Sequence, residues 1–263
     1  VSGSRAAAWA ASLLYALDPA VLLNGRRAMM EGSLFAFGTL AVLAAVWLAR
    51  EQARGAPARR LWLAATALGL SGGLAIASKH PGAIAVMAVF VALALEPSIR
   101  GTTRPRLPDG HLPRLAWASV LVLLVFLLLN PAWWSDPLDM PPRVVEARQN
   151  LMRIQMGGAP APDAVTRVEW LLDRVFFSAP QYYENEGWGA FPGVADEIAA
   201  YGGSWLSGRG TGPVWDVLLP VLFALGVAAL LRRWREGPVW VALWWVALTA
   251  LALLATNTLN WQR

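Results

Sequence analysis

Five charged side chains lie beside long apolar runs, where hydropathy alone would not place them. Asp18, Arg26, Arg27 and Glu31 flank the end of the first run and the start of the second, and Lys79, the only lysine, follows the third. Ionisable groups beside membrane segments often mark functional sites. Arginine forks and a lysine point charge suit a phosphate or diphosphate, and a carboxylate can hold a metal ion or orient a hydroxyl group. If these side chains converge, they predict a site for an anionic headgroup.

The same residues also have ordinary structural interpretations. Asp18 stands directly before Pro19 and could simply end a helix, and the arginine pair at 26–27 could anchor to lipid headgroups. His80 lies beside the lysine, but the only other histidine is His111, so the two histidines do not predict a zinc site.

Seven apolar runs would have to position the charged groups. Most of them approach the length that a helix needs to cross about 30 Å of hydrocarbon. They cover residues 6–23, 33–49, 61–78, 82–95, 115–130, 214–231 and 238–256. The run at 82–95 is short, and only the polar break at 78–82 separates it from the preceding one. The sequence therefore predicts an all-α, polytopic membrane protein with about seven transmembrane helices.

Clusters of arginine orient these spans. Short arginine-rich connections are retained on the cytoplasmic side, and the connections at 50–60, 96–114 and 232–236 are of this kind. Strict alternation of the spans then assigns the candidate charged residues, the stretch 131–213 and the residues after 256 to the outer face.

The stretch 131–213 is too long for a plain connection. Residues 163–177 have apolar side chains at helical spacing, which predicts a helix in the membrane interface with Val168 and Leu172 buried and Arg167 and Arg174 wet. Residues 142–156 repeat the pattern more weakly. The expected organisation is transmembrane helices with an outer-face site at 1–130, a large, partly helical outer loop at 131–213, and truncated C-terminal transmembrane helices at 214–263.

Composition supports a membrane protein and excludes other classes. Hydrophobic residues make up 57% of the 263 residues and charged residues 15%, against roughly 25% charged in soluble domains. The net charge of +5 comes from short clusters between apolar runs, so we expect no nucleic-acid partner. Without cysteine, no disulfide or thiolate metal site can form. The chain begins with Val1 and stops directly after an apolar run, so we expect it to be a fragment.

Four segments, in order, resemble one family. LDPAVLLNGRRAMMEGSLFAF is similar to a segment of the GT-C membrane glycosyltransferases, in the protein O-mannosyltransferase and aminoarabinose-transferase-like branch, where an outer-face arginine precedes an acid at a helix start. GLAIASKHPGAIAV resembles that branch's lysine-x-x-glycine turn, and NPAWWSDP resembles its Asn-Pro-aromatic entry to the large outer loop. NTLNWQR resembles the start of its late Trp-x-Arg motif.

The resemblance implies transfer of a sugar from a polyprenyl-phosphate donor to a hydroxyl of a protein, lipid or glycan acceptor. The reaction would occur at the outer face of a plasma membrane, which we expect to be bacterial. By motif position, Glu31 and Arg26 would be catalytic, and Arg26, Lys79 and Arg263 would bind the donor phosphate, with Arg27 as a neighbour that shares this role. The family's base is expected before the first residue of this chain. A divalent metal is optional, with Glu31 as its candidate ligand.

Two other classes remain open on the sequence. A transporter or flippase for a lipid-linked or anionic substrate would line a pathway with its charges, but the apolar runs show no paired halves. A non-catalytic membrane scaffold would use 131–213 as a docking module. Consumption of a polyprenyl-phosphate sugar would distinguish the transferase from both.

Overall fold

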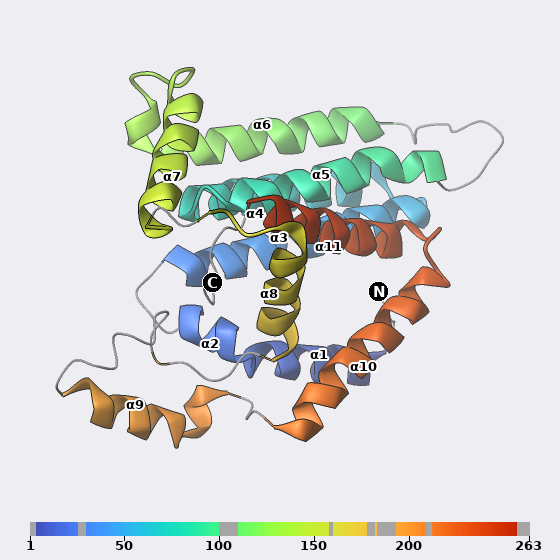
Figure 1. Ribbon diagram of the computed structural model, residues 1–263. Helices are drawn as coiled ribbons and strands as arrows, with labels where there is room; N and C mark the ends of the chain where they lie inside the picture. Colours follow the sequence, from blue (N-terminus) through green and yellow to red (C-terminus); the bar gives the residue numbers. More distant parts are fainter. Residues whose placement is uncertain are drawn as a thin grey trace. The chain divides into compact units, whose positions relative to one another are not determined.

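The computed structural model describes residues 4–25, 30–99, 110–157, 160–177, 182, 193–208 and 212–256 (Figure 1). These ranges consist of helices joined by turns and loops, and they contain no strand. The helices are α1 (Arg5–Ala16), α2 (Pro19–Gly25), α3 (Met30–Ala53), α4 (Ala58–Ser78), α5 (Gly82–Ile99), α6 (His111–Leu129), α7 (Met140–Gln155), α8 (Ala164–Phe176), α9 (Val194–Gly202), α10 (Pro213–Leu231) and α11 (Gly237–Thr256), with short 3₁₀ turns η1 (Pro131–Trp133) and η3 (Trp205–Ser207).

Contacts divide the chain into two compact units. Unit 1 comprises Val1–Gly32, Pro162–Val227 and Asn257–Arg263, and unit 2 comprises Ser33–Ala161 and Ala228–Thr256. Each unit is described below by itself. The sequence-based division by membrane side is a different partition and stays a prediction.

Helix length and composition confirm the all-α polytopic architecture. Within the described ranges, five helices are long and apolar enough to cross a membrane, namely α3, α4, α6, α10 and α11, and α5 contributes a shorter apolar segment, Gly82–Glu96. Six of the seven expected runs therefore correspond to single helices. The chain is an integral membrane protein.

The first expected span, 6–23, is not one continuous helix. It is divided into α1, with 12 residues, and α2, with 7. The carboxylate of Asp18 accepts hydrogen bonds from the backbone amides of Ala20 (3.0 Å) and Val21 (3.2 Å), and Pro19 occupies the first helical position of α2. An N-cap followed by proline starts a new helix, so the run is interrupted. At 1.5 Å per residue, α1 alone is too short to cross the hydrocarbon.

A seam of glycines lets α4 and α6 pack at backbone distance in unit 2. A Cβ atom added to Gly69 would lie 2.6 Å from the Cβ of Leu121, and one added to Gly73 would lie 2.6 Å from the Cβ of Val125. Glycines four residues apart are a common device for close packing of membrane helices. Because residue numbers rise together along both helices, α4 and α6 run parallel.

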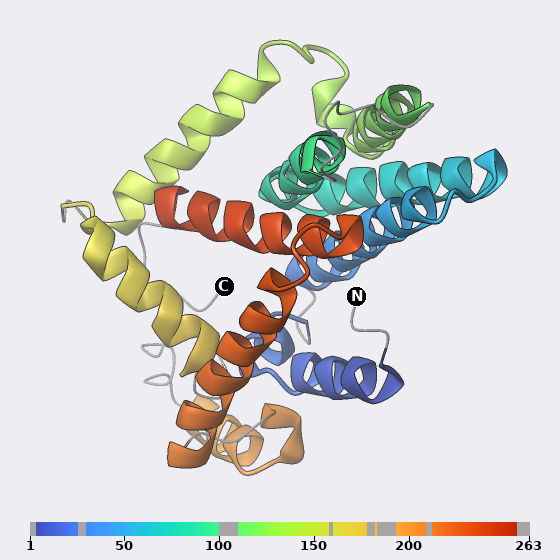
Figure 2. The same ribbon diagram turned by 90° about the vertical axis from the view of Figure 1, so that its right-hand side faces the viewer.

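Polar contacts show that the end of α3, the start of α6, the second half of α5 and the start of α11 lie at the same end of unit 2. The amide Nε2 of Gln52, near the end of α3, lies 2.8 Å from Nδ1 of His111 at the start of α6. The indole of Trp240, near the start of α11, donates to the carbonyl of Ala92 in the second half of α5 (2.9 Å), and α11 packs against α5 (Figure 2). The helix directions inside this unit therefore fit the predicted alternation. Which membrane side this end faces stays a prediction.

The helix expected at 163–177 is confirmed as α8, but the burial expected along it is wrong within the chain. Val168 is 41% exposed and Leu172 is 47% exposed, whereas Arg167 and Arg174 are half-buried. The Nε atom of Arg167 donates to the carbonyl of Pro162, and the ring of Phe176 packs against that of Phe223 in α10. These contacts leave the apolar stripe facing away from the protein.

Candidate functional site

Glu31 occupies the first turn of α3 and is almost fully buried, with 6% of its surface exposed. The amide end of a helix favours a negative charge, so this position stabilises an ionised carboxylate. Burial distinguishes Glu31 from an acid that merely faces headgroups, because a buried carboxylate requires polar or cationic neighbours. Arg26 and Arg27, expected just before it, lie outside the described residues, as does Arg263.

Lys79 follows the last residue of α4 in a tight turn. Its own amide donates to the carbonyl of Ala75 (3.3 Å), and its carbonyl accepts from the amide of Gly82 (2.8 Å), the first residue of α5. The lysine is half-buried and stands at the carbonyl end of α4, which favours a cation. The turn holds the backbone of this lysine in one place, as a phosphate-binding group would need.

An aromatic cluster adjoins this turn. The ring of His80 lies 5.7 Å from that of Trp133, and Trp133 packs edge-on against Phe126 with centroids 4.8 Å apart. His80 is exposed, and its ring contacts aromatic groups. The sequence named the Trp133 segment as a motif but gave no signal that it would meet His80.

The Lys79 turn also meets the beginning of α3. A Cβ atom on Gly82 would lie 2.9 Å from Cδ1 of Leu34, which is one helical turn after Glu31 on α3, and 2.5 Å from the carbonyl oxygen of Ala75. Only glycine fits between these two neighbours. Because Glu31 and Lys79 belong to different units, their convergence on one cleft stays a prediction.

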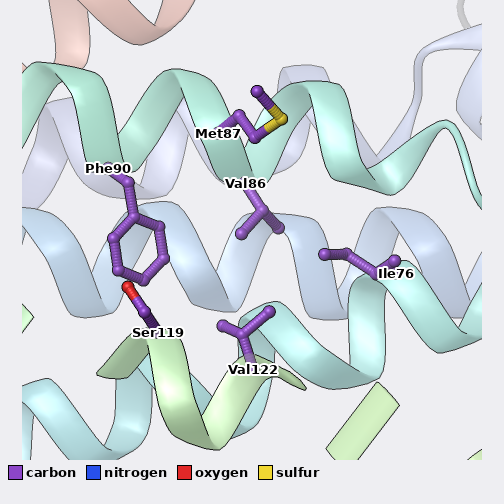
Figure 3. A pocket seen from close by; sticks show the side chains of 6 residues that line it. All are labelled: Ile76, Val86, Met87, Phe90, Ser119 and Val122. Atoms are coloured by element: carbon purple, nitrogen blue, oxygen red, sulfur yellow. The ribbon is translucent and has the colours of Figure 1, made fainter. Parts of the chain in front are cut away.

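An apolar groove lies between α4, α5 and α6 (Figure 3). One of its lining residues, Ile76, stands about one helical turn before Lys79. Its volume is about 260 Å³. The lining side chains are Ile76, Val86, Met87, Phe90, Ser119 and Val122, so one hydroxyl is the sole polar group among them. The sequence did not predict this groove, because lipid-facing and groove-lining apolar residues look alike in a membrane span.

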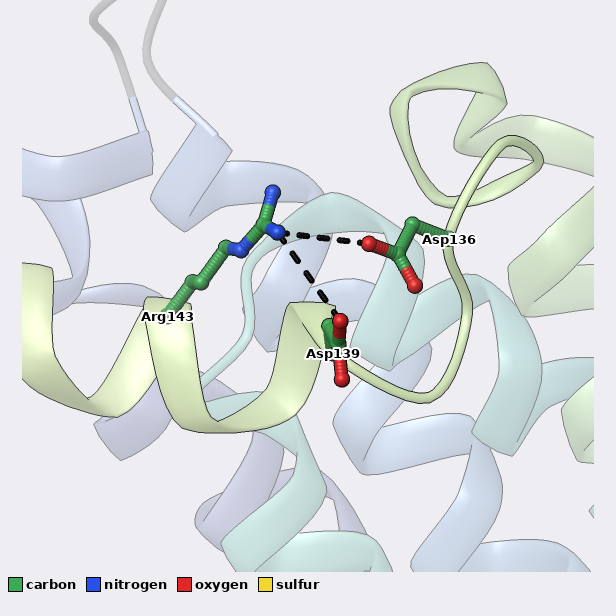
Figure 4. Close-up of polar contacts among 3 residues, drawn as sticks. All are labelled: Asp136, Asp139 and Arg143. Carbon is green, nitrogen blue, oxygen red and sulfur yellow. Dashed lines mark hydrogen bonds and ion pairs between the residues drawn. The ribbon is translucent and has the colours of Figure 1, made fainter.

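A second charged cluster lies at the start of α7 and is structural. Arg143 contacts the carboxylates of Asp136 at 3.3 Å and Asp139 at 3.9 Å (Figure 4). All three side chains are solvent-accessible, and exposed ion pairs of this kind stabilise little. Within the described ranges, no three histidine or acidic side chains gather closely enough to hold a metal ion.

A family model described as dolichyl-phosphate-mannose-protein mannosyltransferase matches residues 1–135. The matched segment covers 135 of the 263 residues and includes positions 26, 27, 31 and 79, but not 263. No curated protein and no solved structure matches the chain.

Proposed function

Because the chain belongs to the dolichyl-phosphate-mannose-protein mannosyltransferase family, we propose that it transfers a sugar from a polyprenyl-phosphate donor to a hydroxyl acceptor at the outer face of a bacterial plasma membrane. The glycosyltransferase class and the membrane setting follow from the family and the apolar helices. The acceptor, which is a protein, lipid or glycan, and the outer-face position are part of the proposal.

One structural observation carries the assignment of the site. A buried acid, Glu31, stands in the first turn of α3, and the second turn of that helix meets the Gly82 end of the turn that bears Lys79. These are an acid and a cation drawn from sequence positions about fifty residues apart. Residues that only anchor helices to headgroups would not require the Lys79 turn to pack against the side chain of Leu34 at the start of α3.

In the proposed reaction, the acceptor oxygen attacks the anomeric carbon while the bond from that carbon to the phosphate oxygen breaks. The bonding electron pair leaves with the polyprenyl phosphate, and the hydroxyl proton passes to a base. Lys79, Arg26 and Arg263, with Arg27 beside them, offset the negative charge that grows on the phosphate, because fixed cations in a low-dielectric site act on developing charge. Glu31 orients an arginine or the acceptor.

The apolar groove gives the donor lipid a place in this scheme. One of its lining residues, Ile76, stands about one helical turn before Lys79, so a phosphate held by the lysine could have the first isoprene units of its chain between α4, α5 and α6. A divalent metal is compatible with the family resemblance, with Glu31 as its candidate ligand. Among the described residues, no group of three histidine or acidic side chains could hold a metal ion, so no step is derived through a metal.

Substitution of the lysine tests the proposal. In membranes containing the full-length protein, Lys79→Ala should lower consumption of a radiolabelled polyprenyl-phosphate sugar by roughly 10²-fold, the scale for losing one preorganised electrostatic contact. Arg26→Ala and Glu31→Gln should have comparable effects. Expression should be largely unchanged, because Lys79 and Glu31 stand at helix ends.

Arg143→Ala is the matched control, since it removes an exposed arginine that pairs only with surface acids in the described part of the chain. Its rate should equal that of the wild type. If the lysine and arginine variants transfer sugar at the wild-type rate, those residues only anchor the helices in the membrane. A protein that moves the lipid-linked sugar across the bilayer without consuming it would be a flippase instead.

A further inference from the structure

A buried cation that the proposed reaction does not use lies at the other end of unit 2. Arg114 belongs to the first turn of α6 and has 7% of its surface exposed. Its Nε and Nη1 atoms are inaccessible to solvent and have no hydrogen-bond acceptor among the described residues. Burying a guanidinium group without an acceptor is costly, so this geometry calls for an anion.

The guanidinium group folds back over the start of its own helix. A Cβ atom on Gly110, the N-cap residue, would lie 3.0 Å from Nη2 and 3.2 Å from Cζ of Arg114. Gly110 has a φ of +72° and provides no side-chain cap. The first-turn amides of α6 that lack intrahelical acceptors are those of His111 and Leu112, since Pro113 has no N–H and the amide of Arg114 donates to the carbonyl of Gly110 (3.2 Å). These amides carry the positive end of the helix dipole. Two independent features, the uncapped helix start and the buried guanidinium, therefore attract the same negative group.

The acid near the C-terminal end of α3, Glu51, is already paired with arginine side chains. Glu51 is buried and has two arginine neighbours, Arg54 and Arg60, each with Nη1 at 3.7 Å from a carboxylate oxygen. The next residue, Gln52, contacts the imidazole of His111 in the first turn of α6. The positive charge of Arg114 is thus not offset by the carboxylate that the α3 end supplies.

We propose that Arg114 and the amino end of α6 bind a phosphate group, supplied by an anionic phospholipid headgroup or by free phosphate. Phosphate matches both parts of the site, since it accepts from an arginine fork and from helix-start amides. The site is separate from the Lys79 turn, which lies at the opposite end of α4. It does not depend on the sugar-transfer proposal.

Ligand-dependent stability tests the site in the complete protein. The purified protein is heated in mixed micelles with phosphatidylcholine alone, with added phosphatidylglycerol, or with added inorganic phosphate, and native mass spectrometry counts retained lipid. Wild type should gain stability from phosphatidylglycerol and retain it, and Arg114→Gln should bind it about tenfold or more weakly, as expected for losing hydrogen bonds to a charged group. Arg59→Gln, which removes an exposed arginine in the first turn of α4, should match wild type.

The three conditions separate the sources of the phosphate. Stabilisation by the phospholipid alone identifies a lipid headgroup, and equal stabilisation by inorganic phosphate identifies a soluble anion. Gly110→Asp covers the case in which Arg114→Gln fails to fold, because it places a carboxylate next to the guanidinium, and asparagine and aspartate tolerate positive φ better than other residues. That variant should fold and lose its response to phosphatidylglycerol.

Two results would overturn the proposal. One is that neither phosphate probe stabilises the wild type, or that both probes stabilise the wild type and Arg114→Gln equally. The other concerns Asp109, which directly precedes Gly110 in the sequence. If Asp109→Asn destabilises the protein as much as Arg114→Gln, and wild type shows no response to phosphatidylglycerol, then a carboxylate of the chain is the anion and no ligand is bound.

Discussion

Individual charged residues at the ends of apolar runs could be recognised from the sequence, but their roles could not. Asp18 and Glu31 both appear as acids beside a run, yet Asp18 caps α2 and Glu31 is buried in the first turn of α3. The sequence suggested only that Asp18 could end a helix, whereas in the structure the Asp-Pro pair starts α2 and thereby breaks the first run. The burial of Glu31 depends on packing between segments, which one sequence does not contain.

At the same scale, we expect the N-terminal cap of α8, formed by Asp163, to depend on pH. Its carboxylate accepts a hydrogen bond from the backbone amide of Thr166 (2.8 Å), and this bond is the main cause that lowers the pKa of Asp163 from its ordinary value of 3.8. A lowered pKa in the folded state means that the cap contributes fully above pH 3.8 and is lost as the pH falls through the folded value.

Hydrogen exchange of the Thr166 amide, corrected for the intrinsic rate at each pH, checks this prediction. Protection should fall below pH 3.8 in the wild type. Asp163→Asn keeps an N-cap acceptor without the titrating charge, so its protection should be independent of pH over that window. The same loss of protection in both proteins would assign the effect to another group.

At the scale of elements, the sequence predicts most helices but not their partners. Six apolar runs and the helix at 163–177 were readable from length and periodicity. The packing of α4 on α6 was not, because lipid-facing and protein-facing apolar residues have the same hydropathy. The burial along α8 was not predictable for a related reason: an amphipathic pattern identifies two faces but not how the rest of the chain packs against them.

The α4–α6 contact predicts a strong position dependence for glycine replacement. Gly73→Leu should destabilise the protein by about 1–3 kcal/mol or more, the usual cost of overpacking, because its Cβ would lie 2.6 Å from that of Val125. Gly226→Leu in α10 is the matched control, since a Cβ there has no atom within 4 Å. Unfolding in mixed micelles measures both. Equal stability of the two variants would mean that α4 and α6 do not pack through this seam.

At the scale of the whole molecule, arginine distribution and helix direction agree although they are independent observations. The arginine-rich connection at 50–60 and the start of α6 lie at one end of unit 2, and α11 begins there with the arginines of 232–236 directly before it. If an odd number of membrane-spanning helices lay between any two of these connections, the two connections would lie at opposite ends of unit 2. The agreement concerns relative direction only, because no bilayer defines inside and outside in the structure.

Cysteine accessibility supplies the missing reference, and the chain has no cysteine of its own to interfere. Ser135→Cys, in the connection between α6 and α7, and Ala58→Cys, at the start of α4, both replace exposed residues, so the bilayer and not protein burial decides their labelling. Retention of arginine-rich connections in the cytoplasm predicts that a membrane-impermeant maleimide labels Ser135→Cys in intact cells and labels Ala58→Cys only after permeabilisation. The permeabilised sample is the control for reactivity. Labelling of Ala58→Cys alone in intact cells would invert the topology, and with it the lysine turn and its proposed donor site would move to the cytoplasmic face.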